Sequence, residues 1–299
     1  MTAPSPSSPA IAVSVPATPR LAFPALLLAN SVLALGPTLV RLADVGPVAA
    51  GFWRLTLALP VLFVLALPGL RRVVLRPAQY GMIVIAGLMF AGDLAAWHMG
   101  IHHTKVANAT LFGNASALAL PLWGLIVLRQ KLRGLQMAAL ALAFVGAAVL
   151  MGGSYELSPA YMRGDLLCVL AGLFYTAYLL MMQDARRRLD GWSALFLASL
   201  AGALPLLLFA LWLGEQVMPL NWWPVIALAV SSQLVGQGLL TYAIGWFSPL
   251  VLGLSLLVQP AIGALLGWAL FGEVMTATDA LGGMLVGAAL ILVRLPARP

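Results

Sequence analysis

One segment limits the folds open to this chain more than any other. From Gln216 to Gly272 the sequence contains no Asp, Glu, Lys, Arg or His. As a single helix this segment would be roughly 85 Å long at about 1.5 Å per residue, nearly three times the roughly 30 Å hydrocarbon core of a bilayer. It therefore holds two membrane spans, and residues 245–249 (Gly-Trp-Phe-Ser-Pro) supply the turn between them.

The composition excludes a soluble globular protein. Apolar residues make up 62% of the chain and charged residues 8%, whereas soluble domains have about 45–50% and about 25%. The net charge of +7 lies in short loops and not on one continuous basic face, so it does not indicate nucleic-acid binding. The single cysteine, Cys168, excludes an intrachain disulfide and a cysteine-based zinc site. We expect no metal and no cofactor.

The same length argument along the chain predicts an all-α integral membrane protein with ten transmembrane helices. The expected spans are 21–41, 47–68, 79–101, 106–128, 134–151, 164–183, 191–213, 222–244, 249–270 and 277–294. The loops between them leave no room for a soluble domain. Residues 1–20, rich in Pro, Ser and Ala, are expected to form a disordered cytoplasmic tail.

The positive charges predict the orientation of the spans. The loops at 71–76, 129–133 and 186–188, together with both chain ends, hold most of the Lys and Arg. The opposite loops hold only Arg41, Lys105 and Arg163 outside the spans. Positive residues concentrate on the cytoplasmic side of membrane proteins, so both termini are expected to be cytoplasmic.

Short motifs recur at a nearly constant offset and indicate an internal duplication. Residues 58–60 (Ala-Leu-Pro) recur at 203–205, Pro121 recurs as Pro260, and residues 145–148 (Val-Gly-Ala-Ala) recur at 286–289. A half with five spans enters on one side and leaves on the other, so its copy lies upside down. We expect two five-helix repeats, at 21–152 and 163–295. Inverted repeats of this kind place a binding site near the midplane between the halves.

Residues 52–54 (Phe-Trp-Arg), 257–260 (Leu-Val-Gln-Pro) and 270–273 (Leu-Phe-Gly-Glu) make the chain resemble the EamA family of the drug/metabolite transporter superfamily. Within it, the chain is most similar to the bacterial inner-membrane amino-acid exporters of the YddG type, which favour aromatic substrates. The resemblance implies a bacterial inner-membrane protein with a central cavity lined by spans 1, 3, 4, 6, 8 and 9. It also implies export of amino acids or similar metabolites.

Two ionisable residues are expected inside the bilayer, where each charge costs about 2.5–3.5 kcal/mol on insertion scales. Arg54 and Asp93 lie at equal depth on consecutive spans, which predicts a structural ion pair. One alternative is that Asp93 contacts a substrate amine or carries a proton. Another is that Arg54 extends to the interface on its own. Asp93 and Trp97 share one helical face beside His98, an arrangement that suits an α-ammonium group, although Trp97 equally suits the membrane interface.

Other polar residues form stripes on the spans of the implied cavity, where they either bind substrate or join helices. The cavity candidates are Asn30, Asp93, Trp97, His98, Asn114, Tyr175, Tyr178, Gln233, Gln237 and Gln259. Kinks or hinges are expected at Gly36, Pro37, Pro121 and Pro260. Gly263 and Gly267 in the ninth span, with Gly282, Gly283 and Gly287 in the tenth, are expected to pack within the chain.

The sequence favours a secondary transporter that exports amino acids by alternating access. An exporter of other small metabolites, drugs or organic cations is the alternative. The phosphate-binding pattern GxxxxGK[ST] is absent, which argues against ATP as the energy source. An intramembrane enzyme is disfavoured because all three histidines lie at 98–103, away from the serines of the second half. The expected partners are a small-molecule substrate and lipid but no nucleic acid, with the chain a monomer or a weak homodimer.

Overall fold

The computed structural model describes residues 19–104, 109, 112–152, 158–271, 277–293 and 295. Within these residues every regular element is helical. The helices of the first half are α1 (Ala22–Leu33), α2 (Gly36–Leu42), α3 (Pro47–Thr56), α4 (Leu59–Leu70), α5 (Pro77–His103), α7 (Ala115–Ile126) and α8 (Gly134–Gly152). Those of the second half are α9 (Met162–Ala185), α10 (Gly191–Trp212), α11 (Trp223–Leu228), the π-helix η1 (Ala229–Gln237), α12 (Gly238–Ile244), α13 (Pro249–Leu256), α14 (Val258–Phe271) and α15 (Ala277–Leu292).

Five helical segments are long and apolar enough to cross a membrane. They are Ala22–Leu42, Pro77–His103, Met162–Ala185, Gly191–Trp212 and Trp223–Ile244. The pair α3 and α4, bent by 41° at residues 57–58, brings this to six if it forms one span. Four shorter apolar helices stand at the remaining expected spans, namely Ala115–Ile126, Gly134–Val149, Pro249–Gly263 and Ala280–Leu292. Most of the tail expected at residues 1–20 lies outside the described residues.

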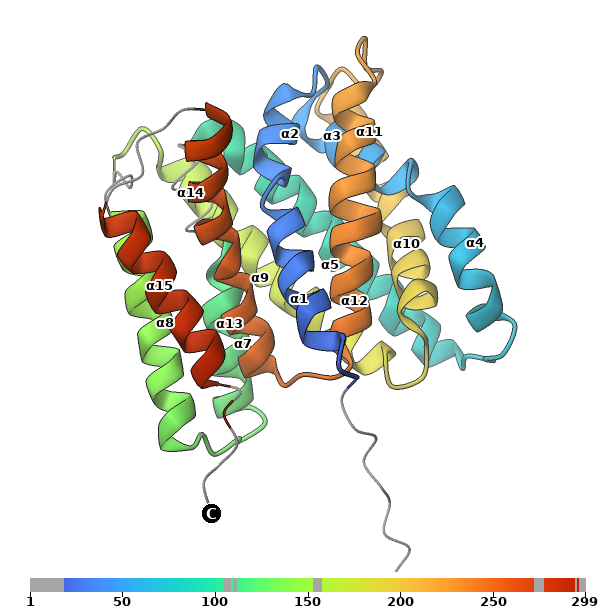
Figure 1. The fold of residues 1–299 in the computed structure, drawn as a ribbon. Helices are drawn as coiled ribbons and strands as arrows, with labels where there is room; N and C mark the ends of the chain where they lie inside the picture. Colours follow the sequence, from blue (N-terminus) through green and yellow to red (C-terminus); the bar gives the residue numbers. More distant parts are fainter. Residues whose placement is uncertain are drawn as a thin grey trace, which may run out of the picture.

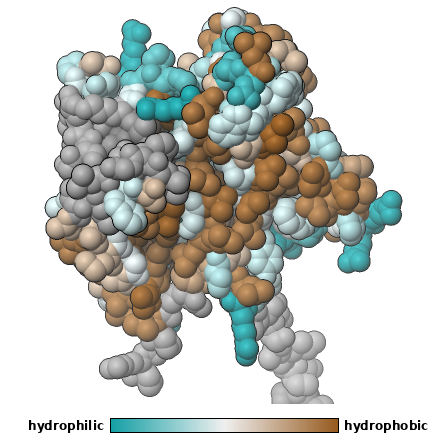
Figure 2. Space-filling model, turned by 45° about the horizontal axis from the view of Figure 1, so that its top comes forward, coloured by the Kyte–Doolittle hydropathy of each residue, from teal (hydrophilic) through white to brown (hydrophobic). Residues whose placement is uncertain are grey.

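Several helices have a proline in their first turn. Proline fits the first turn of a helix because its missing N–H has no intrahelical partner there. Such prolines stand in the first turns of α2, α3, α4, α5, α11 and α13. On the face shown in Figure 2, hydrophobic residues form a broad area, as lipid contact requires. On α10, for example, Leu200, Leu204, Leu208 and Leu211 form a stripe in which each residue is 51–60% exposed.

Helix pairing follows a regular scheme (Figure 1). α8 packs on α15 and α7 packs on α13, while α10 packs on α3, α4 and α5. α5 also packs on α9, and α1 packs on η1 and α12. The third span (α5) corresponds to the eighth, which contains α12, and the sixth span (α9) corresponds to the first, which contains α1. The α5–α9 contact therefore has its counterpart in the contact between α12 and α1. The arrangement is that of two repeats.

The crossing of α5 and α10 depends on a glycine from each helix. A Cβ at Gly87 would lie 2.5 Å from the carbonyl oxygen of Ala198, and a Cβ at Gly202 would lie 2.8 Å from the carbonyl oxygen of Gly87. By contrast, a Cβ at Gly263, Gly283 or Gly287 would meet open space. Among the described residues, the close packing expected at these three glycines is therefore not seen. Gly146 makes the close approach between α8 and α15, since its Cβ would lie 3.0 Å from the carbonyl oxygen of Gly282.

Replacing Gly87 with leucine is expected to destabilise the protein by about 1–3 kcal/mol, because the side chain can fit only by separating the backbones of α5 and α10. The measurement is the free energy of unfolding in detergent micelles. The control is Gly81→Leu on the same helix, where a Cβ would have nothing within 4 Å. Equal stability of the two variants would contradict this account of the crossing.

Candidate functional site

Three buried polar side chains connect helices that are far apart in the sequence. Arg54 of α3 is 4% exposed, and its Nε donates to Oε1 of Gln233 in η1 over 3.2 Å. Nε2 of Gln233 donates in turn to the hydroxyl of Ser199 in α10 over 2.9 Å. Gln233 therefore links the second span to the seventh and eighth. Its oxygen supplies an acceptor that a buried guanidinium requires.

An aromatic stack continues this network across the interior. The guanidinium carbon of Arg54 lies 5.7 Å from the ring centroid of Phe90, within range of a cation–π contact. Tyr178 stacks on Phe90 with centroids 4.4 Å apart, and Tyr175 lies 5.8 Å from Tyr178. The hydroxyl of Tyr175 accepts a hydrogen bond from Nε2 of Gln237 over 3.0 Å. The structure thus brings four of the cavity candidates (Tyr175, Tyr178, Gln233 and Gln237) into one polar and aromatic network.

Asp93 is half-buried on α5, one turn from Phe90. Among the described residues, however, Arg54 and Asp93 form no ion pair within 4.0 Å. The direct ion pair expected between them is therefore absent from this structure, because η1 packs against α3 and brings Gln233 to the guanidinium instead.

Trp97 lies where two chain segments approach α5. A Cβ at Gly36 would lie 3.2 Å from its ring, and a Cβ at Gly113, next to Asn114, would lie 2.8 Å from its Nε1. Ser232 of η1 also adjoins Gly36, since its hydroxyl would lie 3.6 Å from that Cβ. Both glycines give the indole room, so Trp97 occupies the space between the break of the first span and the start of α7.

His98, beside Trp97, is fully buried against α3. Its Nδ1 lies 2.9 Å from the carbonyl oxygen of Pro47. A carbonyl can only accept, so Nδ1 carries the proton, and Nε2 of the neutral ring is an acceptor. Within the described part of the chain, this Nε2 has no hydrogen-bond partner, and the same holds for Oε1 of Gln237 and the hydroxyl of Ser232. Buried polar atoms without a hydrogen-bond partner are rare in proteins, so these three require an explanation.

A second polar cluster joins the first span to the ninth. Nδ2 of Asn30 donates to the hydroxyl of Ser255 over 3.2 Å, and Nε2 of Gln259 donates to Oδ1 of Asn30 over 3.0 Å. The cluster stands one turn before the break at residues 34–35 in the first span and next to the break at Leu257 in the ninth. Asn30 and Gln259 are therefore together, and in the described residues they share no hydrogen bond with the Arg54 network.

The residues expected at kinks stand partly at helix starts and partly inside a helix. α1 ends at Leu33, so Gly36 and Pro37 begin α2. Pro121 lies inside α7 and contacts Gly253 of α13, whose Cβ would lie 2.6 Å from Cδ of the proline. Pro260 stands in the first turn of α14. Whether these positions act as hinges remains a prediction.

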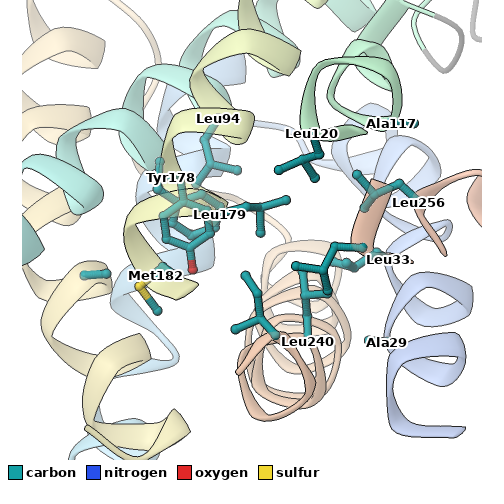
Figure 3. Close-up of a cluster of buried hydrophobic side chains, with 14 of the residues drawn as sticks. Ala29, Leu33, Leu94, Ala117, Leu120, Tyr178, Leu179, Met182, Leu240 and Leu256 are labelled. Carbon is teal, nitrogen blue, oxygen red and sulfur yellow. The ribbon is translucent and has the colours of Figure 1, made fainter. Parts of the chain in front are cut away.

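Buried apolar side chains from five helices meet in the interior of the bundle (Figure 3). This cluster contains Leu33 of α1, Leu120 of α7, Leu179 of α9, Leu240 of α12 and Leu256 of α13, all buried. α9 and α12 end close to this cluster, at the face where the side chain of Gln183 donates to the carbonyl of Phe247.

A carboxylate joins the two repeats at the opposite face. Glu215 follows α10, and its two oxygens accept from the backbone N–H groups of Val48 and Ala49, over 3.3 and 2.9 Å, at the start of α3. Its side chain occupies the space that a Cβ on Gly46 would need. Trp53 adds a bond from its indole N–H to the carbonyl of Val217. A negative charge at a helix N-terminus is stabilising because it satisfies free N–H groups and the helix dipole.

Replacing Glu215 with glutamine is expected to destabilise the protein by about 1–2 kcal/mol, because the amide keeps the shape but loses the charge and one acceptor. Thermal unfolding in detergent measures this. The control is Asp184→Asn, whose partner Arg187 is 3.4 Å away with both side chains exposed. Such surface pairs contribute little. A control variant as unstable as the Glu215 variant would contradict the capping role.

Several of these residues were not found from the sequence. Ser199, Ser232 and Phe90 lie in apolar spans and have no distinguishing local pattern, and η1 has no sequence signal that we recognise. Glu215 follows Gly214, and glycine commonly ends helices, so the sequence marks the end of this span but not the helix that Glu215 caps.

The comparisons with known proteins agree with this architecture. The model of the EamA-like transporter family matches residues 21–152 and again residues 162–295. The chain belongs to the EamA-like transporter family. An uncharacterized transporter of Archaeoglobus fulgidus is 27% identical over 233 residues, which cover 77% of this chain and 82% of the relative. This EamA-like protein also shares its fold with a solved crystal structure, at a TM-score of 0.74 and 19% identity, over 92% of this chain and 96% of the other.

Family membership makes the protein a multi-pass membrane transporter of small substrates and not an enzyme. The two matched segments correspond to the two repeats. The polar network joins helices from both of them, since Arg54 and Phe90 come from the first and Gln233, Tyr175 and Tyr178 from the second.

Proposed function

We propose that this EamA-like protein is an inner-membrane secondary transporter that exports amino acids, with aromatic and other neutral ones favoured, by alternating access. Its ten spans form two inverted repeats, at 21–152 and 163–295, around a central cavity. Contacts at the ends of α1 and α9 support the inversion. Phe23 at the start of α1 contacts Phe247, while Gln183 at the end of α9 donates to the same residue's carbonyl. The first span of one repeat thus begins where the first span of the other ends.

The observation that carries the proposal is Asp93, a half-buried carboxylate in the middle of a span. No described residue neutralises it by a direct ion pair. A carboxylate of this kind attracts a substrate ammonium group, and Trp97 on the next turn offers a ring for a cation–π contact worth about 0.5–2 kcal/mol. The unpaired acceptors of His98 and Gln237 also favour a ligand that donates hydrogen bonds.

The remaining lining chemistry is neutral. Asn30, Gln259, Gln237 and Tyr175 offer amides and a hydroxyl, which suit a zwitterion better than a multiply charged anion. Asn114 stands at the start of α7, after Gly113, which approaches Trp97. Both termini are proposed to be cytoplasmic, because the arginine-rich loops lie on their side.

Counterflow in proteoliposomes tests the proposal. The purified protein is reconstituted in liposomes loaded with one unlabelled amino acid, and entry of the labelled amino acid is followed for each of the twenty. We expect saturable counterflow for aromatic and other neutral amino acids. No saturable flux for any amino acid would overturn the proposal.

Asp93 also favours a second candidate, export of lipophilic organic cations, because such a substrate needs an acidic residue in the membrane. The same liposomes distinguish the two. Counterflow of a labelled organic cation that no amino acid inhibits would favour the cation exporter.

A further inference from the structure

A groove lies at the end of the bundle, away from the polar network. It has a volume of about 390 Å³ and is formed by the loop between α7 and α8 together with the start of α13. Its lining residues are Gln130, Lys131, Leu132, Arg133, Gln136, Ser248 and Leu250. The first five belong to the first repeat and the last two to the second, so the groove spans the junction of the repeats.

The groove is basic and its charges are uncompensated. Lys131 and Arg133 are both exposed, and no acidic residue lines the groove. Among the described residues neither cation forms an ion pair. Gln130, Gln136 and Ser248 add amide and hydroxyl groups. Two free cations with neutral hydrogen-bonding groups in a concave surface suit a phosphate group.

The loop that presents the two cations is held at both ends. Arg129 adopts a left-handed conformation with φ of 50°, and the N–H of Gln130 donates to the carbonyl of Gly124 over 3.0 Å. This bond closes the end of α7 after the left-handed residue. At the other end, the N–H of Arg133 donates to Oε1 of Gln136 over 3.0 Å. The backbone of the loop that carries Lys131 and Arg133 is therefore held at both ends.

Apolar side chains lead from the groove along the outside of the bundle. Ile126, Val127 and Leu128 directly precede it and are 70%, 50% and 51% exposed. Met137, directly after Gln136, is 53% exposed. In a membrane-spanning helix bundle such residues face lipid chains. The groove thus places cations where a lipid-facing surface ends, which is the position of a phospholipid headgroup.

We propose that this groove binds the headgroup of an anionic phospholipid, with its phosphate between Lys131 and Arg133 and its acyl chains along Ile126 and Met137. The lipid then touches both repeats at this face. Free phosphate offers the same charged group, but it has no acyl chains and so would make no contact with the apolar surface.

Native mass spectrometry with phosphatidylglycerol and phosphatidylcholine tests the proposal. We expect the protein to bind phosphatidylglycerol preferentially and the variant K131Q/R133Q to bind it about thirtyfold more weakly, since two surface cations are lost. The control is R71Q/R72Q, which removes two exposed arginines of the loop between α4 and α5, outside the groove. Its affinity should change less than about threefold.

The charge-conserving variant K131R/R133K should bind phosphatidylglycerol like the wild type, and this separates loss of charge from loss of folding. Equal weakening in K131Q/R133Q and R71Q/R72Q would overturn the proposal, because binding would then follow net charge alone. Displacement of phosphatidylglycerol by inorganic phosphate at equal concentration would also overturn it and would assign the groove to a free anion.

Discussion

Replacing Asp93 with asparagine is expected to weaken the binding of amine-bearing substrates about ten- to a hundredfold. Asparagine keeps the size of the side chain and removes only its charge. Hydrogen bonds to charged groups contribute about 1.5–3 kcal/mol, and each 1.4 kcal/mol is a factor of ten in affinity. The measurement is the concentration of unlabelled substrate that halves tracer counterflow. If Asp93 were only structural, the variant would instead lose folded protein and keep its affinity.

Two further variants make this result interpretable. Asp184→Asn removes an exposed carboxylate at the end of α9 and should leave the affinity unchanged. Asp93→Glu keeps the charge and should retain more affinity than Asp93→Asn. The melting temperature of Asp93→Asn should match the wild type, because in this structure the carboxylate forms no ion pair within the described residues.

Replacing Gln233 with leucine is expected to destabilise the protein by about 3 kcal/mol. The change removes the acceptor of the buried Arg54 Nε and the donor to Ser199 at once. Leaving a buried charged group without its partner costs more than the hydrogen bond itself contributes. The free energy of unfolding, from titration with a denaturing detergent, measures this. Gln216→Leu, at an exposed loop position, is the control and should change stability by less than about 0.5 kcal/mol.

A second substitution tests the reason for this loss. In the double variant Arg54→Met with Gln233→Leu the charged group is gone, so the cost should be smaller than the sum of the single costs by about 1 kcal/mol or more. Strictly additive effects would show that Arg54 and Gln233 do not depend on each other.

The positions of the helices could be predicted from the sequence because bilayer thickness sets the length of each apolar stretch. The first span illustrates this, since 21–41 was expected and α1 with α2 covers Ala22–Leu42. The break near Gly36 and Pro37 was also expected, because proline ends or restarts helices. The bend at residues 57–58 was not, although Pro60 stands at the same place.

The partners of the polar residues could not be predicted in the same way. Gln233, Gln237 and Thr241 are spaced as one face of an α-helix. In η1 the turns are wider, and the two amides meet different neighbours. Gln233 binds Arg54 of α3 and Ser199 of α10, whereas Gln237 binds Tyr175 of α9. The same limit applies to Glu215, which caps a helix 166 positions earlier in the chain. Nothing local to either residue encodes such a contact.

Recognition of the substrate ammonium by Asp93 is the central claim, and one competition measurement tests it most directly. An amino acid that supports counterflow is compared with its N-acetylated form as competitors of the same tracer. We predict that the free amino acid competes and that the acetylated form, which has no positive charge to meet Asp93, does not. Equal competition by both compounds would contradict the account.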